Sequence, residues 1–252
     1  MTTPLILVSN DDGVRSSGIA VLAEVAKEFG EVLVVAPSQE QSGASHAITF
    51  RSHLRADPIR EGWFAVSGTP VDSVYLGALH LCSRRPSLVL SGINDGYNLG
   101  MDVHYSGTVG AAREACLRGI HAIAVSVDRG ADPAVAKLAL HQVIPELLAI
   151  SQKSSGFNGV PQLLNLNVPC TPCGQEIQVT RLGHRKYIDQ VQQRVDLEGR
   201  PYYWIGGPPV TQVEESGSDT KAVREGRISL TPLTVEATSP CLDQWSLRLR
   251  RA

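Results

Sequence analysis

Short, wholly apolar runs alternate along this chain with segments whose apolar residues recur at helical intervals. The apolar runs are residues 5–8, 32–36, 88–90 and 122–125, and the helical patterns are residues 18–29, 70–81, 108–118 and 133–150. Short apolar runs are typical of strands buried on both faces. The alternation therefore predicts an α/β fold: a Rossmann-like three-layer core with a mostly parallel sheet between helices.

Length and charge narrow the function classes. The chain has 252 residues, 23 Lys plus Arg against 25 Asp plus Glu, and a net charge of −2. A chain of this length can bury a large core without structural metals. Because no basic stripe is present, a nucleic-acid polymer is an unfavourable partner. No run reaches the roughly 18 apolar residues that cross a bilayer, and the first apolar run is too short for a signal peptide, so we expect a cytoplasmic protein without membrane contact.

The segment after the last helical pattern differs from the first part of the chain. Residues 185–205 alternate apolar and polar positions, carry aromatic side chains, and surround the turn residues Glu198-Gly199-Arg200, which predicts a long hairpin. Exposed aromatic residues usually need a partner surface, so we interpret the hairpin first as a dimerisation element and second as a substrate lid. We expect residues 1–156 to form the catalytic core, and residues 157–252 to complete it and add this extension rather than form an independent domain.

Polar, glycine-rich loops follow three of the apolar runs. Asp11 and Asp12 follow the first run, Ser42 lies in the loop after the second, and Asn94 and Asn98 follow the third. Parallel sheets bind ligands at the carboxyl ends of their strands, so these side chains are expected at one rim. For any one loop, ordinary turn formation explains such residues equally well.

Adjacent carboxylates repel each other unless a positive group lies beside them. The donors expected with Asp11 and Asp12 are the neutral oxygens of Ser42 and Asn94, with no His or Cys in these loops. Such a set favours a hard divalent cation, Mg²⁺, Mn²⁺ or Ca²⁺, over Zn²⁺. Coordination positions left open would admit water and a substrate oxygen, which is a hydrolytic arrangement.

The string Ser106-Gly107-Thr108 leads directly into an alanine-rich helical pattern. A helix start of this kind offers free backbone N–H groups and hydroxyl donors, which suit a phosphate group. Taken alone, the string is better explained by simple N-capping through Ser106 or Thr108. Next to a hard-metal site, phosphate binding becomes the preferred interpretation.

Several common nucleotide and hydrolase motifs are missing from the sequence. No G-x-G-x-x-G follows an apolar run, and neither G-x-x-x-x-G-K-[ST] nor G-x-S-x-G occurs. A dinucleotide-dependent redox enzyme, an ordinary NTPase and a serine hydrolase of the elbow type are therefore disfavoured.

Five strings carry a resemblance to a known family; they lie at residues 7–13, 34–43, 68–72, 91–100 and 105–112, and weaker agreement continues almost to the end of the chain. Together they resemble the survival protein SurE family of metal-dependent nucleoside-monophosphate phosphatases. The resemblance implies one divalent cation per subunit on Asp11, Asp12, Ser42 and Asn94. It also implies a phosphate pocket with Asp102 beside it, lined by Asn10, Asn98, Ser106, Gly107 and Thr108.

The same resemblance implies the reaction and the assembly. Family members remove phosphate from 5′- and often 3′-nucleotides, some also trim short polyphosphate, and their C-terminal hairpins exchange between subunits to form homodimers and often homotetramers. This chain departs from the family at Ser17, where a proline is usual, and Arg15 in that loop would alter substrate preference.

Our leading interpretation is a phosphomonoesterase in which Asp11, Asp12, Asn98 and Asp102 serve catalysis. For Asp102 an acid or water-orienting role and simple turn capping are equally supported. A covalent aspartyl-phosphate route is disfavoured, because the chain has Asn10-Asp11-Asp12 in place of Asp-x-Asp and no lysine between Lys27 and Lys137. The alternative from another class is a non-catalytic nucleotide- or phosphate-binding regulator that uses the same metal pocket.

Overall fold

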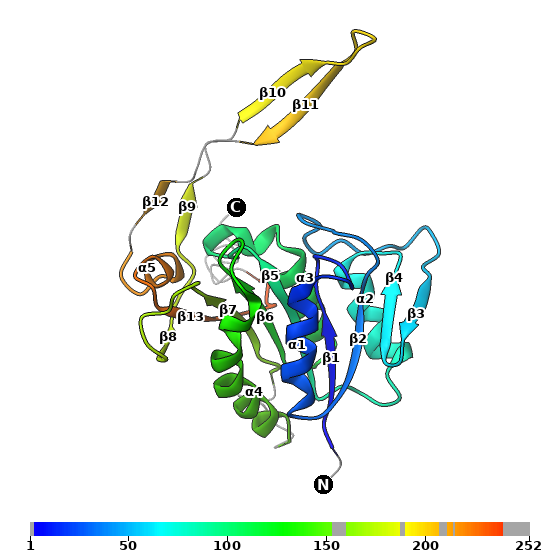
Figure 1. The fold of residues 1–252 in the computed structure, drawn as a ribbon, viewed down its shortest axis with the longest axis vertical. Coiled ribbons are helices and arrows are strands. Elements are labelled where there is room, and N and C mark those ends of the chain that lie inside the picture. The colour runs from blue at the N-terminus through cyan, green and yellow to red at the C-terminus, as the bar shows by residue number, and fades with distance from the viewer. Residues whose placement is uncertain (1–2, 153–159, 187–189, 207–210, 214, 239–252) are drawn as a thin grey trace, which may run out of the picture.

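The computed structural model describes the chain except residues 1–2, 153–159, 187–189, 207–210, 214 and 239–252 (Figure 1). The centre is a nine-stranded sheet in the order β3-β4-β2-β1-β5-β6-β7-β13-β8. Its five central strands, all parallel, are β2 (Glu31–Pro37), β1 (Leu5–Ser9), β5 (Leu88–Asp95), β6 (Ala122–Val127) and β7 (Leu163–Val168). The predicted mostly parallel sheet is confirmed.

Both edges of the sheet depart from the parallel pattern. At one edge β4 (Trp63–Val66) runs parallel to β2, and β3 (Ala56–Arg60) pairs with it antiparallel. At the other edge β13 (Ile228–Leu233) is antiparallel to β7 and parallel to β8 (Ile177–Val179). Apart from β4, these edge strands lack the wholly apolar runs of the centre, and β3 contains Pro58, which is typical of an edge position.

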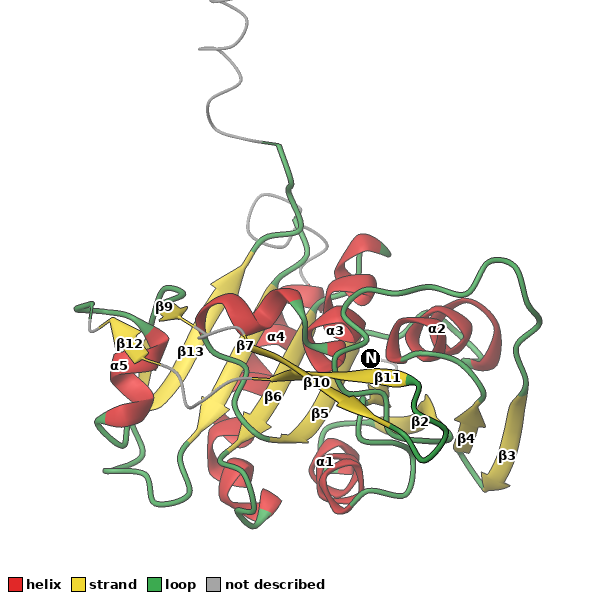
Figure 2. Ribbon diagram, turned by 90° about the horizontal axis from the view of Figure 1, so that it is seen from above, coloured by secondary structure: helices red, strands yellow, loops and turns green. Residues whose placement is uncertain are grey.

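Helices cover both faces of the sheet. They are α1 (Ser17–Lys27), α2 (Pro70–Leu76), α3 (Gly107–Leu117), α4 (Lys137–Gln152) and the short α5 (Asp219–Arg224). Successive residues of β1 point to opposite faces, so Ile6 joins the core cluster of α1 and α4, whereas Leu7 joins that of α2 and α3. Figure 2 shows α1 on one side of the sheet and α2 and α3 on the other, which confirms the three-layer prediction.

Two predicted helices are less regular than their sequence pattern suggests. The pattern at residues 70–81 forms α2 and then the π-helical turn Gly77–Leu81, and α4 is preceded by the 3₁₀ turn Pro133–Ala136. Among the described residues, the stretch Pro133–Gln152 is long and apolar enough to cross a membrane by length and composition. In this fold Leu140, Ile144 and Leu147 on that stretch are buried in the core cluster with α1, so its apolar face packs inside the protein.

The C-terminal part contributes both to the main sheet and to a projection. Strands β7 and β13 lie in the main sheet, while β9 (His184–Lys186) pairs with β12 (Thr211–Val213). Beyond them β10 (Gln190–Val195) and β11 (Pro201–Gly206) form the predicted antiparallel hairpin, which extends away from the core in Figure 1. The expected division at residues 156 and 157 falls outside the described residues and stays a prediction.

Candidate metal and phosphate site

The candidate site lies where the sheet order reverses. From β1 the chain crosses to β2 on one side, whereas β5 lies on the other side of β1. A crevice outside the carboxyl ends of the strands at such a switch point is the usual ligand site of α/β sheets. Asp11 and Asp12 follow β1, and Asn94 lies near the end of β5, so two of the predicted loops meet here.

Asp11, in the loop after β1, is buried against the first turn of helix α3. Its side chain is only 4% exposed, and its Oδ1 accepts a hydrogen bond from the hydroxyl of Thr108. Burial raises the pKa of Asp11, although the Thr108 hydroxyl and the backbone N–H groups of Thr108 and Gly107 oppose the shift. A Cβ added to Gly107 would lie 2.8 Å from Cβ of Asp11, so glycine permits this close approach. The N-terminus of α3 therefore faces the carboxylate directly.

Asp12 is partly buried beside Asp11. Burial and then the negative charge of Asp11 raise the pKa of Asp12 to about 6. Its Oδ2 accepts a 3.4 Å hydrogen bond from the backbone N–H of Asp95, which links the loop after β1 to the end of β5. Two adjacent acids whose pKa values are both raised favour a positive partner, and a divalent cation would supply it.

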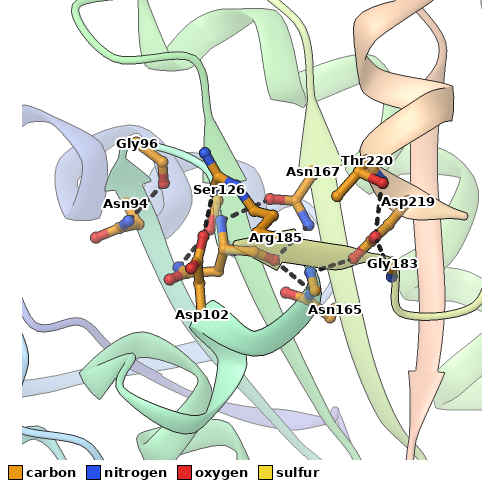
Figure 3. Close-up of polar contacts among 12 residues, drawn as sticks. Asn94, Gly96, Asp102, Ser126, Asn165, Asn167, Gly183, Arg185, Asp219 and Thr220 are labelled. Atoms are coloured by element: carbon orange, nitrogen blue, oxygen red, sulfur yellow. Dashed lines mark hydrogen bonds and ion pairs between the residues drawn. The ribbon is translucent and has the colours of Figure 1, made fainter. Parts of the chain in front are cut away.

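Ser42 and Asn94 supply the neutral oxygens of this set. Ser42 is exposed and donates to Oε1 of Glu40 at 2.8 Å, and its loop is tied to the site by a 2.8 Å bond from the N–H of Gln41 to the carbonyl of Asp11. Asn94 donates its Nδ2 to the Gly96 carbonyl at 2.6 Å, and its Oδ1 points away from Gly96 (Figure 3). The oxygen atoms of this four-residue set therefore suit a hard cation such as Mg²⁺ or Mn²⁺.

This donor set differs from the clusters of strong ligands that hold zinc and similar metals. Among the described residues no group of three or more His, Cys, Asp or Glu side chains could hold a metal ion. The set of two carboxylates and two neutral oxygens contains only two residues of those four types. Its chemistry is therefore that of a weaker, oxygen-only site.

Ser106 and Thr108 have separate tasks at the start of α3. Ser106 is the N-cap, and its Oγ accepts a 3.1 Å hydrogen bond from the N–H of Val109. The capping interpretation is thus right for Ser106, whereas the Thr108 hydroxyl is directed to Asp11. The Ser106 hydroxyl acts as an acceptor in that cap, so its own proton stays available to donate.

Asn98 lies at the centre of a buried amide network. Its backbone N–H donates to Oδ1 of Asn167 at 2.9 Å, and its carbonyl accepts from Nδ2 of Asn165 at 2.8 Å and of Asn167 at 3.1 Å. Its side-chain Nδ2 donates to the hydroxyl of Ser126 at 2.9 Å. Both the peptide and the side chain of Asn98 are therefore held by β6 and β7.

Asn10 shapes the loop between β1 and α1. Its Nδ2 donates to the Gly13 carbonyl at 3.0 Å and to the Ser16 hydroxyl at 2.8 Å. Asn10 is fully buried, and its Oδ1 has no hydrogen-bond partner among the described residues. Ser16 in turn caps α1.

Asp102 belongs to the 3₁₀ turn Gly100–His104 that precedes α3, and its carboxylate is bound by Arg185 of β9. A second carboxylate, Asp219 at the start of α5, accepts hydrogen bonds from the backbone N–H groups of Gly100 at 2.8 Å and Gly183 at 2.7 Å. The C-terminal part of the chain therefore contacts the loop between Asn98 and Ser106 at two places.

Sequence patterns did not assign these supporting residues. The alternation Asn165-Leu166-Asn167 inside a buried strand was an available signal, because buried amides must find partners. Arg185 and Asp219 had no local signal, since their partners lie 83 and 119 residues away in the chain.

A cavity of about 220 Å³ lies elsewhere, lined in part by Arg85, Ser87 and His121. Ser87 directly precedes β5 and His121 directly precedes β6, so this cavity is at the amino ends of the strands. Asp11 lies at the opposite, carboxyl end of its strand. It does not include any predicted site residue.

The fold and the site together define a Rossmann-like α/β protein with an oxygen-donor site facing a helix N-terminus. The chain belongs to the SurE family: the family described as "Survival protein SurE" matches residues 6–189. "5′-nucleotidase SurE" of Syntrophotalea carbinolica is 45% identical over 249 residues, which cover 96% of this chain and 98% of the relative. The protein of the same name from Geotalea uraniireducens is 44% identical over 250 residues, with 96% and 99% covered. The crystal structure of the SurE protein from Aquifex aeolicus superposes with a TM-score of 0.82 at 36% identity, covering 98% of this chain and all of that one.

Proposed function

We propose that this protein is a divalent-metal-dependent phosphomonoesterase that hydrolyses nucleoside 5′-monophosphates, and also 3′-monophosphates and short polyphosphate. The observation that carries the proposal is the contact between Asp11 and the N-terminus of α3, because it would join the proposed cation site to the proposed anion site. The names of the relatives, "5′-nucleotidase SurE", support the hydrolysis of 5′-nucleotides.

The proposed ligands of one Mg²⁺ or Mn²⁺ per subunit are Asp11, Asp12, Ser42 and Asn94, a set that also admits Ca²⁺. When bound, such a cation polarises phosphoryl oxygens and lowers the pKa of a coordinated water. Asp11 and Asp12 would neutralise the cation from the loop after β1. The fixed amide of Asn94, whose Oδ1 points away from Gly96, would approach from β5.

Two side chains of the proposed phosphate pocket, those of Asn98 and Ser106, still have a hydrogen that can be donated to a ligand. The side chain of Asn98 donates one amide hydrogen to Ser126 and has a second, and the Ser106 hydroxyl acts only as an acceptor in its cap. With the backbone N–H groups of Gly107 and Thr108, these donors would stabilise charge on the phosphoryl oxygens. Fixed donors of this kind supply most of the acceleration in phosphoryl transfer. Asn10 would shape the pocket, because both hydrogens of its Nδ2 already bond Gly13 and Ser16.

Asp102 is proposed to orient the pocket and not to act as the proton donor. Its carboxylate is already bound by the guanidinium of Arg185. Its backbone carbonyl accepts from the N–H of Ser106 at 3.0 Å, so Asp102 helps to place the first residue of the pocket.

The remaining expectations concern location and assembly. We propose that the protein acts in the cytoplasm and that the core at residues 1–156 carries the site. The hairpin of β10 and β11 would join subunits into a homodimer or homotetramer, because it presents exposed apolar side chains that include Tyr203 and Ile205 on one face and Trp204 on the other.

Phosphate release from a panel of 5′- and 3′-nucleoside monophosphates tests the proposal. Protein stripped of metal should be inactive and should regain activity with Mg²⁺ or Mn²⁺. Asp11→Asn should lower this activity by more than about 100-fold, because even residues that only orient metal ligands contribute about 10–100-fold. The matched control is Asp57→Asn on the exposed edge strand β3, which should behave as wild type. Metal and nucleotide binding without any release would instead support the non-catalytic regulator.

A further inference from the structure

We propose that Arg185 of the C-terminal extension is a positioning residue for the phosphate pocket, and that it acts through its ion pair with Asp102. The inference rests on the proposed function and deepens it. It assigns to β9, which directly precedes the hairpin segment, a part in phosphate binding at the core.

The ion pair is shielded from solvent. Nη1 of Arg185 donates to Oδ2 of Asp102, and the two side chains are only 18% and 11% exposed. Removing one partner of a shielded pair leaves the other charge uncompensated, which is costly. The Arg185–Asp102 contact is therefore a strong constraint on the turn that holds Asp102, whereas an exposed ion pair would be a weak one.

That turn connects the two halves of the proposed pocket. The N–H of Asp102 donates to the carbonyl of Leu99 at 3.1 Å, next to Asn98. The carbonyl of Asp102 accepts from the N–H groups of Tyr105 at 2.9 Å and Ser106 at 3.0 Å. A displacement of Asp102 would thus shift the backbone next to Asn98 on one side and Ser106, the N-cap of α3, on the other.

A second contact fixes the direction from which Arg185 approaches. Asp219 binds the N–H of Gly100 and the N–H of Gly183 with one carboxylate, and these glycines each lie two residues before a member of the ion pair. The two backbones are so close that a Cβ on Gly100 would lie 2.4 Å from the carbonyl oxygen of Gly183. The start of β9 therefore lies directly against the turn, where Arg185 meets Asp102 (Figure 3).

The described ion pair of Arg185 lies apart from the proposed metal ligands. The hydrogen bonds described for the carboxylates of Asp11 and Asp12 come from Thr108 and Asp95, on α3 and β5. We therefore expect substitutions at Arg185 to weaken phosphate binding and leave metal affinity unchanged. This combination separates a positioning role from general loss of structure.

The experiment compares Arg185→Gln and Arg185→Lys with Arg181→Gln. Arg181 lies in the same segment, is exposed, and pairs with Glu215 of the extension, so it is a matched control. Each full-length protein is assayed for kcat and KM with a nucleoside monophosphate and Mn²⁺. Calorimetry then measures Mn²⁺ binding and the binding of inorganic phosphate to Mn²⁺-loaded protein, and thermal unfolding is recorded.

We expect Arg185→Gln to lower kcat/KM and phosphate affinity by about 10–100-fold, the range for residues that orient a site's direct ligands, with Mn²⁺ affinity unchanged. Arg185→Lys keeps the charge and should recover part of the loss. Asp102→Asn should give a similar loss, and the double variant should be no worse than either single one. Arg181→Gln should match wild type.

Two outcomes would overturn the inference: phosphate affinity in Arg185→Gln equal to that in Arg181→Gln, or additive losses in the double variant. Phosphate affinity is read without turnover, so failure of the inference is distinct from failure of the proposed function. A wild-type protein that binds phosphate with Mn²⁺ yet releases none from nucleotides would reject only the proposed function. If Arg185→Gln does not fold, Arg185→Lys and Asp102→Asn carry the same comparison.

Discussion

The hydroxyl of Thr108 donates a hydrogen bond to Oδ1 of Asp11 across 97 residues of sequence. Both side chains are buried, and the contact joins the first turn of α3 to the loop after β1. It couples the proposed anion site to the proposed metal site through one bond. Loss of the Thr108 hydroxyl should therefore affect both sites.

Replacement of Thr108 by valine keeps the shape of the side chain and removes the donor. The Oδ1 of Asp11 would then lose its hydroxyl partner, and we expect kcat/KM to fall by about 10–100-fold, as for other groups that orient metal ligands. Thr108→Ser restores the hydroxyl and should recover most of the activity. Steady-state kinetics with Mn²⁺ checks both variants, and equal activity in Thr108→Val and Thr108→Ser would contradict the role.

Replacement of Gly107 by alanine tests the close approach of α3 to Asp11. The added Cβ would lie 2.8 Å from Cβ of Asp11 and 3.0 Å from its Oδ2, so the carboxylate or the helix must shift. Because small misplacements of catalytic groups cost about 100-fold, we expect a loss of that size together with weaker Mn²⁺ binding. Gly206→Ala on the hairpin, where the Cβ meets nothing within 4 Å, is the control. Wild-type Mn²⁺ affinity in Gly107→Ala would show that the approach is not critical.

The amide network around Asn98 predicts that substitutions at Asn167 and Asn165 weaken phosphate binding and stability to different extents. Asn167 makes two hydrogen bonds to the backbone of Asn98, whereas Asn165 makes one. Each substitution by alanine removes partners of buried backbone groups, at a cost of about 1–3 kcal/mol of stability. We expect Asn167→Ala to lower phosphate affinity and stability more than Asn165→Ala. Urea unfolding and phosphate calorimetry measure the order, and the reverse order would refute this account.

Glu114 on α3 predicts a pH-dependent stability effect away from the site. Burial alone would raise the pKa of Glu114, but the hydrogen bonds from His46 and Arg118 and their charge outweigh it, so the pKa is lowered. The nearly buried Glu114 lies 2.7 Å from Arg118 and 2.9 Å from His46. Glu114→Gln should therefore cost about 1–2 kcal/mol at neutral pH.

The sign of this pH dependence follows from the lowered pKa. The unfolded state binds the Glu114 proton at higher pH than the folded state, so the stabilisation is complete above the ordinary pKa of 4.5 and is lost as pH falls through the lowered folded value. Urea unfolding of wild type and Glu114→Gln at neutral pH and below 4.5 measures the difference. A difference that stays constant with falling pH would rule out the carboxylate as its source.

The hairpin predicts an effect on assembly. The register pairs Val191 with Ile205 and Gln193 with Tyr203, so these side chains share one face, and the three apolar ones are 58–89% exposed. Replacing Tyr203 and Ile205 by serine should shift the protein to a smaller oligomer in sedimentation experiments. Gln192→Ser, on the opposite face, should leave the assembly unchanged. A wild-type monomer would contradict the proposed role of the hairpin and favour a substrate lid.

Arg185 and Asp219 show why part of the candidate site could not be predicted from the sequence. Asp11, Asp12 and Asn94 lie where apolar runs end, so topology rules alone place them at one rim. Arg185 and Asp219 meet their partners only because β9 and α5 fold back on the turn before α3. Contacts at such separations depend on how the C-terminal segment packs, and no local pattern encodes that packing.

Local pattern along the chain is enough to specify four of the five central strands (β1, β2, β5 and β6), the helices between them, the polar loops at the strand ends and the hairpin turn at Glu198-Gly199-Arg200. These features depend on hydrophobic period and turn chemistry, which act between near neighbours in the chain. Long-range packing selects the rest: Thr108 binds Asp11, Asn165 and Asn167 hold Asn98, and the sheet ends in antiparallel pairings at β3 and β13. Pattern cannot specify these pairings, because a buried polar group takes whichever partner the assembled layers bring within reach.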